Sequence, residues 1–446
     1  MKFIETLKNI WKIEALRSRI IVTLGFLLVY RFGAHIPLPG IDASQLNQLA
    51  DNTQSGLLGL LNAFTGGAFA KASILALGIM PYISASIVVQ LMGIAVPYLQ
   101  KLQKEGESGR KRLNQITRWL TIAITLVQAP SYLASLPALG IPESAFLLGY
   151  STLFWTSSII ILTTGTVFAM WLGEKITDKG IGNGISLLIM VGIIARMPVA
   201  FIQEFSSRVT ESNGGLILIL IEVIIWLLVI MASIMLVLAV RQIPVQYARR
   251  SATGVMEKNV AGSRQYIPLK LNASGVMPII FAQAIMFIPA AVIGLSESDT
   301  AQSFTAALSN IFGFWYNLLF AVLIILFTYF YTAITVPTNK MADDLKRSGG
   351  FIPGIRPGKE TSEYLDKIMS QITFPGSLFL ALIAIMPAFV VNIVGIQQSW
   401  ALFYGGTSLL ILVGVAIDTL QQVNSYLLNK HYDGLMKTGK NRKAIA

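Results

Sequence analysis

The stretches of this chain that look like ligand-binding motifs lack the residues that such chemistry needs. Residues 434–441 (GLMKTGKN) approach a phosphate-binding loop, but Asn441 stands where the Mg²⁺-binding Ser or Thr belongs. No strand pattern precedes them, so we interpret them as part of a basic tail. Residues 180–184 (GIGNG) lack the spacing of a dinucleotide-binding loop. We interpret these glycines as a tight turn with a close helix approach.

Side chains for metal, thiol or proton chemistry are scarce. The chain has no Cys, and His35 and His431 lie near opposite ends, so we expect no disulfide, metal centre or other cofactor. Few charges fall within predicted membrane spans, among them Arg196, Glu222 and Asp418, and Arg31 lies near the outer end of the first span. A charge inside a membrane is a functional hypothesis by default, but these acids are scattered and form no proton relay. The role of Glu222 stays open between a partner helix, a polar cavity and lipid.

The composition is that of a polytopic membrane protein rather than a soluble enzyme. Of 446 residues, 54% are hydrophobic and 13% are charged, and the mean hydropathy is +0.65. A membrane-spanning helix needs about 20 apolar residues. The apolar runs predict ten such spans, at residues 20–36, 72–98, 117–136, 152–173, 185–205, 215–240, 273–295, 314–335, 372–394 and 403–425.

The basic residues predict how the chain is oriented in the membrane. A net charge of +12 suggests nucleic-acid binding, but cytoplasmic loops of membrane proteins also collect Lys and Arg. With the N-terminus inside, all Lys and Arg but four fall in inner segments, and the four are Arg31, Lys71, Arg196 and Arg208. We therefore expect both termini in the cytoplasm. The basic inner loops remain compatible with an RNA or an acidic protein as partner.

The ten spans divide evenly around a short loop at residues 206–215. Five spans on each side permit two oppositely oriented halves, residues 20–205 and 206–425, with a cavity at their interface. Residues 1–19 place apolar side chains on one helical face, which predicts an amphipathic helix on the inner membrane surface. Residues 426–446 are expected to form a basic cytoplasmic tail.

The segment at residues 56–70 is apolar and helix-patterned, but it is too short to cross a membrane. Gly66 and Gly67 interrupt it, and a long apolar run follows at residues 72–98. A short, broken helix is tolerated at membrane depth only where protein or a water-filled cavity surrounds it. We therefore expect a cavity with this segment folded into it.

Two inner loops, residues 241–270 and 336–371, are too long to be simple connectors. The second loop carries Pro–Gly and Gly–Gly pairs at spacings that favour a stiff, turning loop, and it carries charge as well. We expect these loops to project as a docking surface.

Neutral polar residues and isoleucines within the spans have plain structural interpretations on their own. Ser84, Ser86, Gln128 and Asn272 are typical of ordinary hydrogen bonds between membrane helices. Ile79 and Ile83 lie one helical turn apart, and Ile189, Ile280 and Ile411 lie within other spans, as core or lipid-facing residues would. Residue type alone assigns none of them a function.

Taken together, the chain resembles the SecY family of protein-conducting channels along essentially its whole length. The blocks that carry the resemblance are FGAHIPLPGID (32–42), FTGGAFAKASILALGIMPYISASI (64–87), KEGESGRK (104–111), GEKITDKGIGNGIS (173–186), SGGFIPGIRPG (348–358) and FYGGTSLLI (403–411). Ten spans with both ends inside agree with it independently.

The resemblance implies an all-α fold of ten transmembrane helices, in two inverted five-helix halves around an hourglass pore. Residues 56–70 match the family's plug, a short helix in the outer funnel, with Gly56, Leu57, Leu60, Asn62, Phe64, Gly66 and Gly67. The pore ring that seals the waist matches Ile79, Ile83, Ile189, Ile280 and Ile411. A lateral gate toward lipid matches Ser84, Gln128 and Asn272.

The resemblance also implies function and partners. The family conducts unfolded secretory proteins across the bacterial inner membrane and releases membrane segments into lipid, without being an enzyme. Its partners are the subunits SecE and SecG, the motor ATPase SecA, the ribosome, signal sequences, nascent chains and lipids. Docking is implied for Arg356, Phe351, Arg249 and Arg250, whereas residues 254–264 depart from the family pattern, as do Arg196 and Glu222.

Two other classes of protein remain as alternatives on the residues alone. An ion-coupled secondary transporter of a small molecule requires a charged coupling residue at a substrate site in the membrane. A groove-type insertase without an aqueous pore is the second alternative. Ten spans and the short segment at residues 56–70 argue against the insertase.

Overall fold

The computed structural model describes residues 11, 13–46, 56–138, 141–147, 149, 151–210, 215–247, 265–293 and 310–443. The chain packs as two compact units. Unit 1 comprises Met1–Asn213, Ile396–Phe403 and Val415–Ala446, and unit 2 comprises Gly214–Gly395 and Tyr404–Gly414. The division near residue 213 follows the loop between the two predicted halves. The addition of the two later segments to unit 1 has no signal in the sequence.

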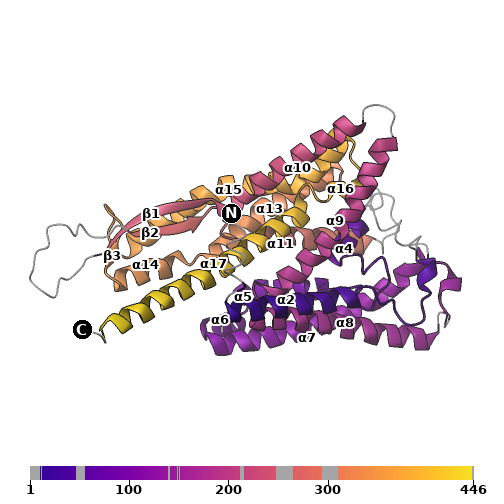
Figure 1. Cartoon of the computed structure of the whole chain (residues 1–446), viewed down its shortest axis with the longest axis horizontal. Coiled ribbons are helices and arrows are strands. Elements are labelled where there is room, and N and C mark those ends of the chain that lie inside the picture. The colour runs from indigo at the N-terminus through magenta and orange to yellow at the C-terminus, as the bar shows by residue number, and fades with distance from the viewer. Residues whose placement is uncertain are drawn as a thin grey trace, which may run out of the picture. The chain divides into compact units, whose positions relative to one another are not determined.

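Unit 1 is a bundle of helices around short irregular segments. Helices α2, α7 and α8 run alongside one another, and α8 also contacts α9 (Figure 1). The elements of unit 1 are α2 (Glu14–Gly33), η1 (Ala43–Gln45), α4 (Gly56–Phe64), α5 (Met80–Ala95), α6 (Pro97–Lys104), α7 (Glu107–Ala138), η2 (Glu143–Ala145), α8 (Thr152–Lys179), α9 (Gly184–Thr210), α16 (Gln398–Ala401) and most of α17 (Gly406–Lys443).

Unit 2 combines long helices with a small sheet. Helix α13 packs against both α11 and α15, and α10 also contacts α15. Its elements are α10 (Gly215–Leu238), β1 (Val240–Tyr247), β2 (Gln265–Lys270), α11 (Met277–Ile293), α13 (Phe314–Thr335), α14 (Thr338–Arg347), β3 (Gly350–Phe351) and α15 (Lys359–Val394), with the first turns of α17.

The helices fit the predicted membrane spans. Within the described residues, seven helices are long and apolar enough to cross a membrane, or eight if the bent pair α5–α6 counts as one span. A helix also stands at the two remaining predicted positions, namely α2 and α11. The fold is therefore the helical polytopic membrane fold that the sequence predicts. Residues 1–10 and 12 of the predicted surface helix lie outside the described part.

The second predicted span, residues 72–98, differs from the expectation at both ends. Its helix begins only at Met80, because Gly78 takes a left-handed φ of +53° and Pro81 stands in the first turn. It then bends by 104° between α5 and α6. Val96 lies between these helices with φ −100° and ψ 114°, since the following Pro97 disfavours a helical backbone before it.

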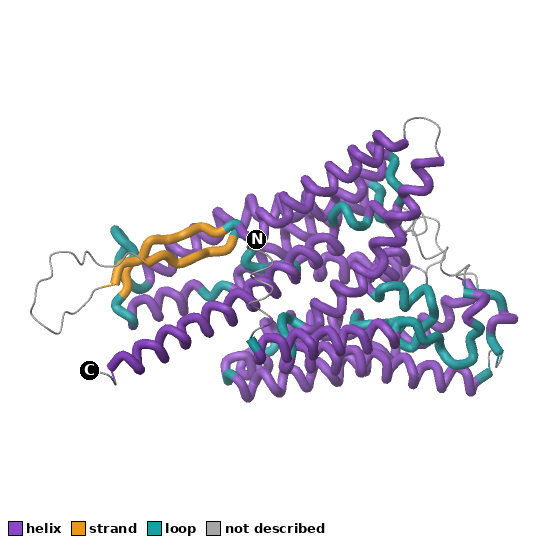
Figure 2. Tube along the Cα trace, viewed as in Figure 1, coloured by secondary structure: helices purple, strands orange, loops and turns teal. Residues whose placement is uncertain are grey.

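The inner loops contain a three-stranded sheet that the sequence analysis did not identify (Figure 2). Its order is β2-β1-β3, and both pairings are antiparallel. Pro244 and Pro268 interrupt the strand patterns of β1 and β2, which hides them in the sequence. Pro244 is tolerated because, within the described ranges, β3 pairs with Gln246 and Tyr247 and no strand pairs with that edge of β1 at Pro244.

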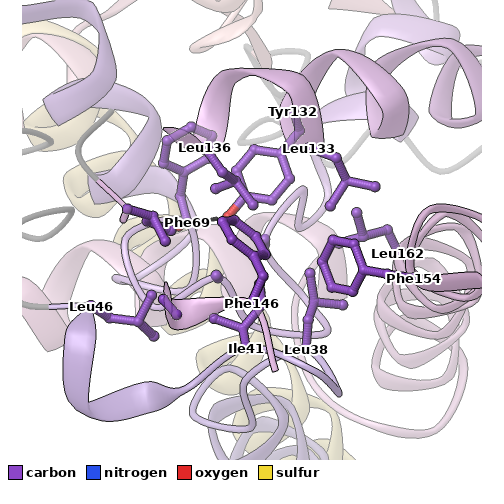
Figure 3. Close-up of a cluster of buried hydrophobic side chains, with 14 of the residues drawn as sticks. Leu38, Ile41, Leu46, Phe69, Tyr132, Leu133, Leu136, Phe146, Phe154 and Leu162 are labelled. Carbon is purple, nitrogen blue, oxygen red and sulfur yellow. Dashed lines mark hydrogen bonds between the residues drawn. The ribbon is translucent and has the colours of Figure 1, made fainter. Parts of the chain in front are cut away.

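The irregular segments of unit 1 are held by a buried apolar cluster (Figure 3). The cluster joins α7 and α8 to stretches that lie outside the long helices. Its largest side chains include Leu38, Ile41, Phe69, Tyr132, Leu133, Leu136, Phe146 and Phe154. Because these side chains come from segments far apart in the sequence, the cluster fixes where the non-helical backbone runs.

Candidate functional site

The 56–70 segment, which the family resemblance matches to a plug, is a short helix followed by a turn in unit 1. Helix α4 ends at Phe64, just before the Gly66–Gly67 pair, and residues 65–79 form turns rather than helix. Leu60, Asn62 and Phe64 are buried, whereas the side chains of Gly56 and Leu57 lie outside the described part. Helix α4 lies beside α9 (Figure 1).

The turn after α4 satisfies its own backbone through side chains of the same segment. The fully buried Asn62 accepts a hydrogen bond from the Ala70 N–H at 3.2 Å through Oδ1, and its carbonyl accepts from the Gly67 N–H at 2.9 Å. The Thr65 hydroxyl accepts from the Phe69 N–H at 3.2 Å. These bonds replace the helix ladder that the glycines interrupt, and a buried backbone group without a partner would cost about 1–3 kcal/mol.

The turn rests directly on the backbone of α9. Gly66 adopts φ +65°, and a Cβ there would lie 2.8 Å from the Cα of Gly192. A Cβ on Gly192 would in turn lie 2.7 Å from the Phe64 carbonyl oxygen. Only glycine fits at both positions, because each approach is closer than a real Cβ allows. The sequence analysis missed Gly192, since a helix-embedded glycine has no local signal for this contact.

Three cationic residues lie at this turn. Arg31, in the last turn of α2, donates from Nη1 to the Gly66 carbonyl oxygen. Nη1 of Arg196, on α9, lies 3.4 Å from the Cβ position of Gly67. Lys71 belongs to the turn itself, where its backbone N–H donates to the Gly67 carbonyl oxygen at 3.2 Å, and its side chain is exposed. Partial desolvation, and then the charges of Arg31 and Arg196, lower the pKa of Lys71 below its ordinary value.

The far end of the turn is anchored in the apolar cluster. The Tyr132 hydroxyl donates to the Phe69 carbonyl oxygen at 2.9 Å, and the two rings lie 4.9 Å apart (Figure 3). The Leu38 N–H donates to the Ala72 carbonyl oxygen at 2.8 Å, and the Ile74 N–H to that of Ile36 at 3.0 Å. The turn is thus held at one end by the contact of Gly66 with Gly192, and at the other end by Phe69 in the apolar cluster and by these hydrogen bonds.

The five isoleucines predicted as a pore ring are divided between the units. In unit 1, the Ile83 N–H donates to the Ile79 carbonyl oxygen at 3.1 Å at the start of α5, and Ile189 lies on α9. In unit 2, Ile280 lies on α11 and Ile411 on α17. Ile79, Ile189 and Ile411 are buried, and the other two are half-buried. Their common role stays a prediction.

The three polar residues predicted for a lateral gate occupy different environments. Ser84 is half-buried on α5, and Gln128 is exposed on α7. Asn272 is buried in a turn before α11, where its Oδ1 accepts from the Ser274 hydroxyl at 3.2 Å. Asn272, Val276 and Ile280 are spaced four residues apart, as on one helical face, but α11 begins only at Met277. Of the two steps, the helical one is the second, in which the Ile280 N–H donates to the Val276 carbonyl oxygen at 3.3 Å.

The tip of the second inner loop stands on a packed base in unit 2. Its base is a buried cluster of Ile243, Val245, Leu269, Leu345, Ile352, Leu365, Ile368, Met369 and Ile372. Phe351 pairs with Gln246 as part of β3. Arg356 extends from the tip with 88% of its side chain exposed, and its Nη1 lies 3.8 Å from Oε1 of Glu360. Arg249, Arg250 and residues 254–264 lie outside the described part.

These features define a polytopic helical membrane protein with a short helix and turn folded against its own spanning helices. The SecY family model matches residues 73–420. The protein translocase subunit SecY of Halalkalibacterium halodurans is 42% identical over 444 residues, covering 97% of this chain and 99% of that protein. That of Streptomyces scabiei is 39% identical over 444 residues, covering 96% and 98%. The chain belongs to the SecY family.

Solved structures agree on the fold at low sequence identity. One described as the structure of a protein conducting channel superposes with a TM-score of 0.59 at 17% identity, covering 92% of each chain. A SecY structure that concerns the plug domain superposes with a TM-score of 0.61 at 16% identity, with the same coverage. These likenesses support the helical architecture, and the family assignment rests on the relatives of higher identity.

The contact between Gly66 and Gly192 makes a testable prediction. Gly192→Val should push the turn off α9, because overpacking costs about 1–3 kcal/mol and the neighbouring atoms are backbone. The chain has no natural Cys, so Ala68→Cys, at a fully buried position, serves as a reporter. Maleimide labelling of that thiol should become about tenfold faster or more.

Gly25→Val is the matched control, because nothing lies within 4 Å of a Cβ at Gly25 in the spanning helix α2. It should leave the labelling rate unchanged. Equal labelling rates in the Gly192→Val and Gly25→Val proteins would contradict the close contact between the turn and α9.

Proposed function

We propose that this chain forms a protein-conducting channel that translocates unfolded secretory proteins and releases transmembrane segments laterally into lipid. The observation that carries the proposal is its identity of 39–42%, over nearly the whole chain, to protein translocase subunits. The short helix and turn at residues 56–70, packed on α9, agree with a channel that has a plug. The family is one of channels, and the chain is not an enzyme.

The seal is proposed to combine the 56–70 segment with the five isoleucines. Aliphatic side chains at a narrow waist disfavour water and ions, so a hydrophobic constriction closes by dewetting. Ile79, Ile83, Ile189, Ile280 and Ile411 offer no directional bonds, which lets polypeptides of any sequence slide past. The 56–70 segment stops the pore at rest and leaves when a chain enters.

A second, lateral opening is proposed along Ser84 on α5, Gln128 on α7 and Asn272 in the turn before α11. Hydrogen bonds between membrane helices are worth about 0.6 kcal/mol each on average, so such a seam opens without a large cost. An apolar segment of about 20 residues then gains by moving into lipid. A signal sequence is the natural trigger, because it is such a segment.

The inner loops are proposed to dock the partners that drive translocation. The exposed Arg356 stands on a packed base, and its guanidinium suits RNA phosphate or a carboxylate. Phe351, Arg249 and Arg250 are proposed beside it. The partners are the ribosome and the SecA motor ATPase. SecE and SecG are proposed as companion subunits within the membrane.

The chain is a multi-span membrane protein, and the bacterial inner membrane with both termini cytoplasmic is its proposed location. All Lys and Arg but Arg31, Lys71, Arg196 and Arg208 fall in segments that this orientation places inside. The alternative of an ion-coupled transporter gains no support. Glu222, a charged residue within a predicted span, is buried. Its backbone carbonyl oxygen accepts a hydrogen bond from the Tyr404 hydroxyl at 3.0 Å.

The proposed seal can be tested by introducing polar side chains into the proposed pore ring. Ile83→Asn combined with Ile280→Asn should raise the ion conductance of the resting channel in planar bilayers, because polar side chains stabilise water in a constriction. A double change at exposed isoleucines of spanning helices, Ile160→Asn with Ile224→Asn, is the control and should stay tight. A tight seal in the first variant would remove these residues from the ring.

The docking surface can be tested by reversing one charge. Arg356→Glu should lower motor- or ribosome-driven export by about tenfold or more, because a like charge then faces an anionic partner. Lys101→Glu, an exposed change on α6 outside the two docking loops, is the control. Equal export rates for the two variants, at equal protein levels in the membrane, would argue against docking through Arg356.

A further inference from the structure

The cations outside the inner segments differ in whether a carboxylate neutralises them. Arg208 is paired, since its Nε lies 2.9 Å from Oε1 of the buried Glu204 on the same helix. Arg31, Lys71 and Arg196 are not paired with a carboxylate. Within the described ranges, no carboxylate lies within ion-pair distance of any of these three. Yet all three meet at the turn after α4.

The guanidinium donors at this turn are also largely unpaired within the described residues. A guanidinium has five N–H donors in a fixed fork. Arg31 donates to the Gly66 carbonyl oxygen. Arg196 is half-buried and lies against Gly67, but among the described residues its guanidinium has no hydrogen-bond acceptor. A partly buried side chain with unused donors, next to two like charges, is costly unless an anion joins it.

We propose that Arg31, Lys71 and Arg196 form a binding site for a small oxyanion of the phosphate type at the turn after α4. The guanidinium fork matches two oxygens of such an anion, and the Lys71 ammonium adds a third charge. The three residues come from α2, α9 and the turn itself. A bound oxyanion therefore ties the turn to both helices and removes the repulsion between the cations.

The site needs only the fold of unit 1, and its occupancy is measured without any transport. The consequence for gating rests on the proposed channel function, because an oxyanion that holds this turn would favour the closed channel. A failure of phosphate binding is therefore distinct from a failure of the channel assignment.

The first test measures the binding of radiolabelled inorganic phosphate to the purified full chain, with any subunits that copurify, in a maltoside detergent that contains no phosphate. We expect saturable binding. Arg196→Gln should weaken it by about tenfold or more, because a hydrogen bond to a charged group is lost. Lys71 is exposed, so Lys71→Gln keeps the fold and should weaken binding by about fivefold.

Arg17→Gln is the matched control, since Arg17 is exposed and lies at the opposite end of the helix that carries Arg31. Its phosphate affinity should equal that of the unmodified chain. The absence of saturable binding to the unmodified chain would overturn the proposal. So would equal affinities in the Lys71→Gln and Arg17→Gln proteins.

Two further measurements locate the anion and identify its source. Phosphate should slow hydrogen exchange of the amides at residues 66–71, and unchanged exchange at saturating phosphate would overturn the proposed location. Added phospholipid that displaces the labelled phosphate would identify a lipid headgroup phosphate as the resident oxyanion. Binding that persists with phospholipid present would identify the free anion, and either result supports an oxyanion site.

Discussion

The structure of unit 1 depends on one constraint, which is that a membrane interior offers no water to polar backbone groups. A helix meets this constraint by itself, but residues 65–79 do not form a helix. Their backbone groups are paired instead in turn hydrogen bonds along the segment, and the side chains of Asn62, Thr65 and Tyr132 add further bonds. These side chains are what allow an irregular segment to stay among membrane-spanning helices.

The turn is held to the rest of unit 1 by contacts of two kinds. Gly66 meets Gly192 by backbone contact, and Phe69 packs on Tyr132 in the apolar cluster (Figure 3). The hydrogen bonds that Asn62 and Thr65 accept lie within the segment itself, whereas those from Arg31 and Tyr132 join it to α2 and α7. Release of the segment, which the proposed channel function requires, would break the second set and keep the first.

The sequence predicted the features that depend on local composition. Hydropathy located the helices, and the Gly66–Gly67 pair located the end of α4, because both signals act over a few residues. The late start of α5 and its bend before Pro97 were not predicted, since apolar composition continues through both. The small sheet was hidden by Pro244 and Pro268, which interrupt the strand patterns of β1 and β2.

Features that depend on distant parts of the chain were beyond the sequence. Arg31, Lys71 and Arg196 stood out as cations outside the inner segments, but their meeting at one turn requires the packing of α2 and α9. Gly192 looked like an ordinary helix glycine. The grouping of residues 396–403 and 415–446 with unit 1 is likewise a property of the folded chain.

We propose that extended polypeptides pass the position that residues 56–70 occupy at rest. The most direct measurement is photocrosslinking from an amino-acid probe at Ile83, Ile189 or Ile411 to a stalled secretory chain. A probe at the exposed Leu227 on α10 serves as the reference. We predict adducts from the three isoleucine positions and none from Leu227. Adducts from Leu227 alone, or from no position while the chain is stalled, would contradict the claim.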